Sequence, residues 1–449
     1  MLKGIKIKGL FNRFNYDIKL KPGGITIITG PNGYGKSTIL RIINSISNEA
    51  LEKIIELPFK QIEVSFTDSE PFLIEKLKES IKINGIKIPI QMINNRYIDE
   101  INYVSTRILD NENLYDNEFN RRIYLDNYRN KDNILRNLYM NIKRNIDVKE
   151  PFLLNVLANL MTTNKDNKEK NSQVDQIIKC QNILDKVRES IGEIKFIREQ
   201  RLLEERVVDK NRSSDSRVKI VQVIKEIPDK LLNHIKNVMN EHSNLSSKLD
   251  SSYPERLFNS ESDLDKTEFE ESLKEIVEYQ SRLTKYELSE QQNSFNPRFD
   301  KTYSKALKVY FSDSKEKFHV FKSLLEKLDA FESIVNDKFN SKKIVISKNF
   351  GLKVLDDSNN LLELQQLSSG EQEILVLFFQ LIFETNERLL LIDEPEISLH
   401  IAWQKELLED FKKIVRVKNG DVNIIISTHS PQIINNNWNI QIDLGELSV

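Results

Sequence analysis

The sequence predicts an α/β fold in which segments from both ends of the chain contribute strands to one sheet. Near the N-terminus, the apolar run ITIIT (residues 25–29) leads into a glycine-rich loop and then a helical pattern. Near the C-terminus, the apolar runs of residues 389–392 and 422–426 each end in polar residues. Short continuous apolar runs are typical of central strands that are covered on both faces. The stretch between these regions carries apolar residues at three- and four-residue steps, which predicts helices.

Composition limits the class of protein. A chain of 449 residues corresponds to two or three structural units at roughly 100–200 residues each. The net charge of −2 argues against a global basic surface, so any surface for nucleic acid is expected to be local. The single cysteine, Cys180, excludes an intramolecular disulfide framework and a Cys-rich zinc site. No apolar run approaches 18 residues and the N-terminus lacks a signal-peptide pattern, so we expect a soluble cytoplasmic protein without a membrane partner.

The spacing of apolar residues divides the chain into two lobes and a helical arm. Alternation at residues 2–10 predicts a strand, whereas helical steps from Ile220 onward predict an antiparallel arm of coiled-coil type. Pro228 is expected to start a helix or kink one, and residues 251–260 are expected to form the tip of the arm. The expected domains are a first lobe at 1–201 with a helical insertion at about 67–190, the arm at 202–340, and a second lobe at 341–449.

The strongest motif is a phosphate loop between the strand at 25–29 and the helix that follows it. Its glycines allow successive backbone amides to point at a phosphate, Lys36 supplies a counter-charge, and Ser37 supplies a hydroxyl for Mg²⁺. The pattern therefore predicts a site for a nucleoside triphosphate. The candidate residues are Gly30, Pro31, Asn32, Gly33, Tyr34, Gly35, Lys36, Ser37 and Thr38, together with Arg13 between the two preceding strands.

Two carboxylates follow the apolar run of residues 389–392. The end of a buried parallel strand lies at the sheet edge where nucleotides bind. Asp393 fits a ligand of Mg²⁺, and Glu394 fits a base for the attacking water. Paired acids after a strand are on their own more typical of a solvated loop, but the phosphate loop upstream favours the catalytic interpretation.

Three further groups are weaker candidates. Ser368, Ser369, Gly370 and Glu371 precede an apolar helix, so they are either an ordinary N-cap or an anion-binding helix start. His429 follows a predicted buried strand and is either structural or within reach of a γ-phosphate. Gln200 follows the strand at 193–197 and either contacts the metal or its water, or is a surface residue.

The order of these elements resembles the ATP-binding-cassette (ABC) ATPase head, split by a helical insertion as in SMC-like and DNA-repair proteins. The resemblance covers residues 1–66, about 193–201, and 342–449. After the two acids, EPEISLH resembles OLD-type and related AAA-like ATPases of bacterial phage defence. The segments GPNGYGKSTIL, FIREQRL, LSSGEQEILVLFFQLIF, IDEPEISLHIAWQ and STHSPQII are similar to the ATPase subunits of the PARIS and Septu defence systems.

This resemblance implies an ATP- and Mg²⁺-dependent ATPase whose site is complete only when two heads face each other. Ser369 and Gly370 would then contact the γ-phosphate that is bound to Lys36 of a second copy. The expected partners are other copies of this chain, a separate effector nuclease (Toprim-like or HNH), and a phage-encoded trigger protein. The chain ends 20 residues after His429, so we expect the nuclease to be another polypeptide.

Two other classes of function stay open at this stage. A transporter subunit is disfavoured, because the insertion is long and EPEISLH differs from the transporter pattern. A DNA-repair or DNA-end ATPase of the SMC or RecF kind is the alternative. The segment Asn120–Asn145 interleaves arginines with tyrosines, which suits single-stranded nucleic acid, although a solvated helical face explains it as well.

Overall fold

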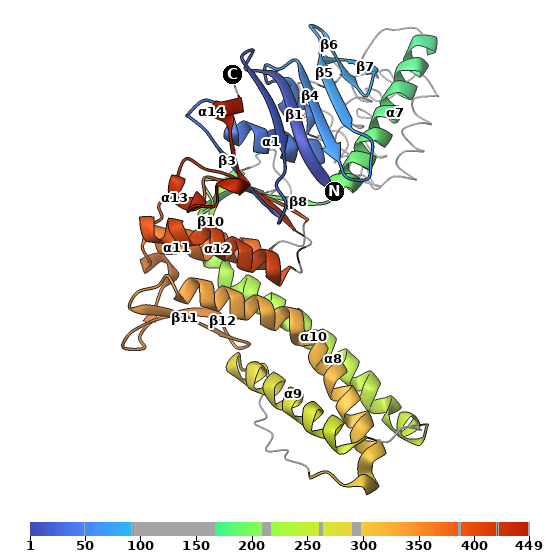
Figure 1. Ribbon diagram of the computed structural model, residues 1–449, viewed down its shortest axis with the longest axis vertical. Helices are drawn as coiled ribbons and strands as arrows, with labels where there is room; N and C mark the ends of the chain where they lie inside the picture. Colours follow the sequence, from blue (N-terminus) through green and yellow to red (C-terminus); the bar gives the residue numbers. More distant parts are fainter. Residues whose placement is uncertain are drawn as a thin grey trace, which may run out of the picture.

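The computed structural model describes residues 1–48, 50–90, 93, 167–208, 217–259, 264–289, 298–384, 388–418, 420 and 422–447. Figure 1 shows an upper body of sheets and short helices, from which long helices extend downward as an arm. No helix in these ranges has both the length and the apolar character that crossing a membrane requires. The segment Asn120–Asn145 lies outside the described residues.

A five-stranded parallel sheet forms the centre of the body and confirms the predicted α/β fold class. All five residues of β3 (Ile25–Thr29) and of β14 (Leu389–Asp393) are buried, which explains why both are almost entirely apolar in the sequence. Segments from both ends of the chain pair in this sheet, as expected for a split head. In spatial order the strands are β16 (Gln441–Asp443), β3 (Ile25–Thr29), β15 (Asn423–Ser427), β14 (Leu389–Asp393) and β8 (Ile194–Ile197).

The two faces of the parallel sheet pack into different cores. Ile28, Leu391 and Ile425 pack into a core with the first helices and an antiparallel sheet, whereas Leu390 and Ile392 pack against the helices that follow in the second lobe. The first core is built from β1 (Leu2–Leu10), β2 (Phe14–Lys19), α1 (Lys36–Ser47), α2 (Leu51–Ile55), β4 (Gln61–Phe66) and α7 (Asn167–Ile191). The second core includes α11 (Ser369–Phe383) and α12 (Ile401–Val417).

The expectation of a helical insertion from residue 67 is wrong for its first part. Residues 72–89 hold three strands that continue the antiparallel sheet in the order β2-β1-β4-β5-β6-β7. Asn84 and Gly85 both have positive φ, which is the geometry of a tight two-residue hairpin turn. The helical expectation holds for α7, and residues 94–166 lie outside the described part of the chain. The new strands are β5 (Phe72–Lys76), β6 (Ser80–Ile83) and β7 (Ile86–Pro89).

The long helices of the arm extend downward in Figure 1, and Pro228 lies in the first turn of the first one, α8 (Ile227–Phe258). The expectation that helical structure begins near Ile220 is wrong, because an antiparallel ribbon precedes the arm and Ile220 belongs to it. The arm helices are α8 (Ile227–Phe258), α9 (Lys266–Lys285) and α10 (Ser304–Asn336), and the ribbon strands are β9 (Leu203–Val208) and β10 (Arg217–Gln222).

Within the segment expected to form the tip of the arm, residues 251–258 are the last two turns of helix α8. Arg256 explains why the helix continues beyond its internal proline, Pro254. Its guanidinium pairs with the buried carboxylate of Asp313 in α10, and its Nη2 donates to the carbonyl of Leu249, about two turns earlier in α8, at 2.7 Å. The last turns of α8 are therefore fixed by contacts that the local sequence does not reveal.

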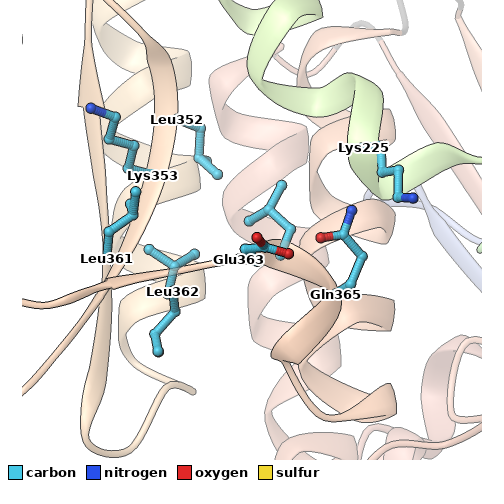
Figure 2. Close-up of a pocket in the computed structure, with 9 residues that line it drawn as sticks. Lys225, Leu352, Lys353, Leu361, Leu362, Glu363 and Gln365 are labelled. Atoms are coloured by element: carbon cyan, nitrogen blue, oxygen red, sulfur yellow. The ribbon is translucent and has the colours of Figure 1, made fainter.

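A small antiparallel sheet joins the arm to the second lobe. It consists of β11 (Lys342–Ser347), β12 (Gly351–Asp356) and β13 (Leu361–Leu362). A hollow of about 350 Å³ lies between this sheet and Lys225, which is in the turn before α8. Figure 2 shows the residues that line it. None of the residues that line the hollow belongs to the motifs identified in the sequence. The remaining short elements are η3 (Val223–Glu226), η4 (Lys301–Tyr303), η5 (Leu364–Gln366), α13 (Pro431–Ile434), η6 (Trp438–Ile440) and α14 (Leu444–Leu447).

Candidate nucleotide-binding site

The loop between β3 and α1 has the backbone geometry of an anion cradle. Gly30, Gly33 and Gly35 have φ of 144°, 82° and 87°, a region that residues with a side chain rarely adopt. Gly35 is the N-cap of α1 and no side chain caps this helix, so the first backbone amides are available to an anion. The residues from Gly30 to Thr38 that were predicted to bind the nucleotide therefore form one loop and the first turn of α1, at the edge of the parallel sheet.

Lys36 lies between the phosphate loop and the end of β15. Its Nζ is 3.0 Å from the carbonyl oxygen of Gly30 and 2.6 Å from Nε2 of His429. Burial lowers the pKa of Lys36, and the nearby carboxylates of Glu394 and Asp393 oppose that shift. The structure thus brings the phosphate-loop lysine and the histidine together, although 393 residues separate them in the sequence.

Ser37 and Asp393 form a pair of oxygen donors next to this lysine. Ser37 Oγ donates to Asp393 Oδ1 at 2.8 Å, and Ser427 at the end of β15 donates to the same oxygen. Asp393 is 1% exposed. Hydroxyl and carboxylate oxygens are the ligands that Mg²⁺ prefers, and this pair occupies the position where the metal of a phosphate-loop site is held. The residues present therefore fit Mg²⁺.

Glu394 occupies the next position, in a strained backbone conformation. Its φ is +46°, in the left-handed region that non-glycine residues avoid. Its amide donates to the carbonyl of Ser427 at 2.9 Å, and its Oε1 lies 3.1 Å from Nε2 of His429. Burial raises the pKa of Glu394 to about 8, the neighbouring Glu396 adds to the rise, and Lys36 opposes it. This is the environment of a group that exchanges a proton near neutral pH.

Glu396 is a site residue to which the motif pattern assigned no role. Its Oε1 accepts hydrogen bonds from Thr428 Oγ1 at 2.5 Å, the His429 amide at 2.9 Å and the Ser430 amide at 3.1 Å. These contacts attach the loop after β14 to the loop after β15. The signal in the sequence was the second acid of Glu394-Pro395-Glu396, which was interpreted only as part of the resemblance of EPEISLH to defence ATPases.

Gln200 and Arg13 lie at the margin of the site. Gln200 is exposed beyond β8 at the same sheet edge, and within the described ranges no hydrogen bond joins it to Asp393 or Ser37. The Arg13 guanidinium lies 5.0 Å from the centre of the Phe14 ring. That ring is 4.8 Å from the ring of Tyr34 in the phosphate loop, so Arg13 approaches the loop through two aromatic side chains.

The start of α11 presents two serines to solvent. Ser368 is the N-cap, and both Ser368 and Ser369 are exposed. Gly370 is buried, and a Cβ at this position would lie only 2.7 Å from the carbonyl oxygen of Ser398, so the two backbones are in close contact here. Glu371 turns back to the amide of Ser368 at 2.8 Å and also pairs with Lys342 at 2.8 Å. Ser368 and Glu371 therefore stabilise the helix start as a capping box, while Ser369 is the exposed group open to a ligand.

This arrangement can hold a triphosphate on backbone amides and Lys36, place a divalent cation at Ser37 and Asp393, and offer Glu394 as a proton acceptor.

Similar solved structures are SMC heads. The SMC head bound to the C-winged helix domain of ScpA is 11% identical, with 97% of this chain and 91% of that chain covered and a TM-score of 0.35. The SMC head domain from Thermotoga maritima is 10% identical, with 96% of this chain and 90% of that chain covered and a TM-score of 0.33.

The SMC head domain with a coiled coil and joint derived from Pyrococcus yayanosii is 13% identical, with 97% and 93% of the two chains covered and a TM-score of 0.35. Among curated proteins, no relative matches this chain. The sequence profile of the AAA ATPase domain matches residues 1–434, which is nearly the whole chain. The chain therefore belongs to the AAA ATPase domain family and is an ATPase of that type.

Proposed function

We propose that this ATPase depends on Mg²⁺ and that a second copy of the chain completes its site. The observation that carries the proposal is the meeting of Lys36, Asp393, Glu394 and His429 at one sheet edge, while Ser369 lies exposed at a different helix start. The amides of Ser369 and Gly370 lie between the two residues of the Ser368–Glu371 capping box, at the positive end of the helix dipole, and two facing copies would enclose the triphosphate between this helix start and the phosphate loop.

In this mechanism the phosphate-loop amides and Lys36 bind the β- and γ-phosphates. Ser37 and Asp393 hold Mg²⁺, which neutralises charge on the phosphate oxygens when it is bound. Glu394 accepts the proton of the attacking water, and His429 contacts the γ-phosphate. The contact between Lys36 and His429 must open to admit the phosphates, since both nitrogens face the same space.

We further propose a cellular role: the chain is the regulatory ATPase of an anti-phage defence system. It would form a homo-oligomer based on head dimers and control a separate effector nuclease in response to a phage protein. The resemblance of EPEISLH to defence ATPases supports this role. The ribbon of β9 and β10 and the arm also support it, because they add surfaces that hydrolysis does not require. An SMC- or RecF-like role in DNA repair is the alternative.

The first experiment tests hydrolysis with Lys36→Ala and Glu394→Gln. Lys36→Ala should lose ATP binding, because the triphosphate loses its main counter-charge. Glu394→Gln should still bind ATP but hydrolyse it on the order of 100-fold more slowly, since the proton acceptor is gone. Lys343→Ala removes an exposed lysine of β11 and is the matched control. Normal turnover by Glu394→Gln, measured as phosphate release, would refute the assignment of the base.

The cellular role is tested in cells that express this chain together with the gene next to its own, which under this proposal encodes the effector nuclease. Wild-type protein should protect cells from phage, and both site variants should abolish protection while Lys343→Ala retains it. Salt-dependent binding of DNA by the purified chain, without any effect of the variants on protection, would favour the repair alternative.

A further inference from the structure

A buried ion pair connects the end of β8 to the helix that starts with the exposed serines. Arg201 follows Gln200, and Glu373 lies in α11. Arg201 Nε is 2.5 Å from Glu373 Oε2, and the two side chains are 1% and 7% exposed. Buried charges of this kind are retained only when they are paired, and the pair fixes the relative position of its two elements.

The same guanidinium also holds the loop that carries the candidate base. Arg201 Nη2 donates to the carbonyl oxygen of Pro395 at 3.0 Å. Pro395 lies between Glu394 and Glu396, and its carbonyl belongs to the peptide bond with Glu396, one residue beyond the candidate base. Arg201 therefore contacts α11 on one side and the backbone of the catalytic loop on the other.

This loop needs external support. Glu394 has a left-handed φ of +46°, a conformation that persists only where surrounding contacts enforce it. The bond from the Glu394 amide to the Ser427 carbonyl, at 2.9 Å, holds the residue from the side of β15. The bond from Arg201 to Pro395 holds the loop from the side of β8. Without the second contact, the Pro395–Glu396 peptide loses its anchor on this side, and the backbone at Glu394 is free to relax.

The polar network around Arg201 is incomplete in the described part of the chain. Arg201 Nη1 and Glu396 Oε2 are both buried and neither has a hydrogen-bond partner there. The charge of Glu396 acts on the guanidinium. A buried donor without an acceptor raises the free energy of this arrangement, so a rearrangement of the network that pairs the donor when the loop moves is favoured.

We propose that Arg201 is a positioning residue, which holds Glu394 in its hydrolytic conformation and links it to α11 through Glu373. The inference rests on the proposed ATPase mechanism. It adds a direct route by which a phosphate at the exposed start of α11 affects the base of the opposite site. An arginine is required because its planar fork reaches two acceptors in different directions, whereas a lysine ammonium is a single point.

The central test is the double variant Arg201→Met/Glu373→Met. It removes both buried charges and leaves an apolar pair of similar size, a replacement that buried ion pairs generally tolerate. We expect near-wild-type thermal unfolding and an unchanged ATP Kd and KM. The kcat should fall by about 10- to 100-fold, because the base is misplaced rather than removed. Arg201→Lys should keep the charge pair but fail to restore kcat.

The matched control is Lys338→Met/Asp410→Met. This pair is equally buried, with 1% and 4% exposed side chains 2.5 Å apart, and it joins the end of α10 to α12 away from the base. It should leave kcat unchanged. Wild-type kcat in the Arg201/Glu373 double variant, or full activity of Arg201→Lys, would overturn the inference.

A second readout does not depend on hydrolysis. Hydrogen exchange without nucleotide should be faster in residues 394–399 of the Arg201/Glu373 double variant than in wild type, and unchanged in the control. If wild-type protein hydrolyses no ATP, the proposed mechanism fails, and this exchange comparison still decides the positioning role. Equal exchange of this segment in wild type and the double variant would show that Arg201 does not hold the loop.

Discussion

The carboxyl group of Glu394 gives the site a distinct pH dependence. Burial and the neighbouring Glu396 raise its pKa to about 8, so the free protein holds this group protonated at lower pH. A base must be ionised, and kcat/KM reports the ionisation of the free enzyme. We expect kcat/KM for ATP to fall about tenfold per pH unit below about pH 8. Initial rates at subsaturating ATP across this range measure it.

The control for this prediction is Glu396→Gln. The variant removes the adjacent negative charge but keeps an oxygen that can accept from Thr428 and His429. The pKa of Glu394 should then fall, and the decrease of kcat/KM on the acidic side of the pH profile should move to lower pH. If this decrease stays at the same pH, the pH dependence belongs to another group.

The same shift affects stability in a definite direction. Because the folded pKa of Glu394 lies above the ordinary value of 4.5, the folded state binds the proton more tightly. The contribution of this group to stability is present at acid pH and is lost as the pH rises toward about 8. Glu394→Gln should remove that slope from the pH dependence of unfolding.

The site residues that could be predicted from the sequence are those whose residue type and local spacing point to a single chemical role. Lys36, Ser37 and Asp393 were predictable for that reason, and the structure brings them together. Arg201 and Glu396 were not, because their roles come from contacts between strand ends that are far apart in the sequence. Nothing in the local pattern distinguishes Arg201 from the exposed Gln200 beside it.

At the scale of elements, the packing of the arm on the second lobe depends on Gly351. It begins β12 with a φ of +71°, and a Cβ there would collide with the carbonyl oxygen of Pro228 at the start of α8. Gly351→Ala combines backbone strain with a steric clash, so we expect a loss of at least about 2 kcal/mol in the free energy of unfolding. Chemical denaturation measures it.

Gly85→Ala separates the two contributions. Gly85 also has a positive φ, +84°, but nothing lies within 4 Å of the added Cβ. This variant should lose only about 1 kcal/mol, the cost of the backbone conformation. Equal losses at the two positions would mean that the contact between α8 and β12 does not constrain the arm.

Elements were predictable where one local signal acted without competition. The buried helix α11 contains a ten-residue apolar run, 374–383, that only Gln380 interrupts, and Pro228 marks the start of α8 correctly. The strands at 72–89 were missed although Asn84-Gly85 is a strong hairpin signal, because the isoleucine-rich surroundings also fit helical spacing. At 203–222, the apolar residues of a strand and of the following helix formed one apparent periodicity.

At the scale of the whole molecule, the exposed start of α11 is the feature that the proposed head dimer would cover. Ser368 and Ser369 face solvent, while Glu371 and Gly370 are fixed inside the protein. A single sequence carries no direct information about how two copies face each other. The composite site therefore has to be tested by combining defects in different protomers.

The test mixes Lys36→Ala with Ser369→Arg. Each variant alone should be inactive: the first lacks the phosphate counter-charge, and the second fills the approach to the γ-phosphate with a long side chain. In a mixed dimer, one site combines an intact Lys36 with an intact Ser369, and the other site carries both defects. Random pairing makes about half of the dimers mixed, so the mixture should recover about a quarter of wild-type ATPase activity.

Ser243→Arg is the control, since it places the same side chain on an exposed position of α8 and should leave hydrolysis intact. Mixing it with Lys36→Ala separates pairing from a general effect of the arginine. If Lys36 and Ser369 act within one chain, every dimer in the first mixture has two defective sites. Activity no higher than the sum of the two separate variants would then exclude a site shared between copies.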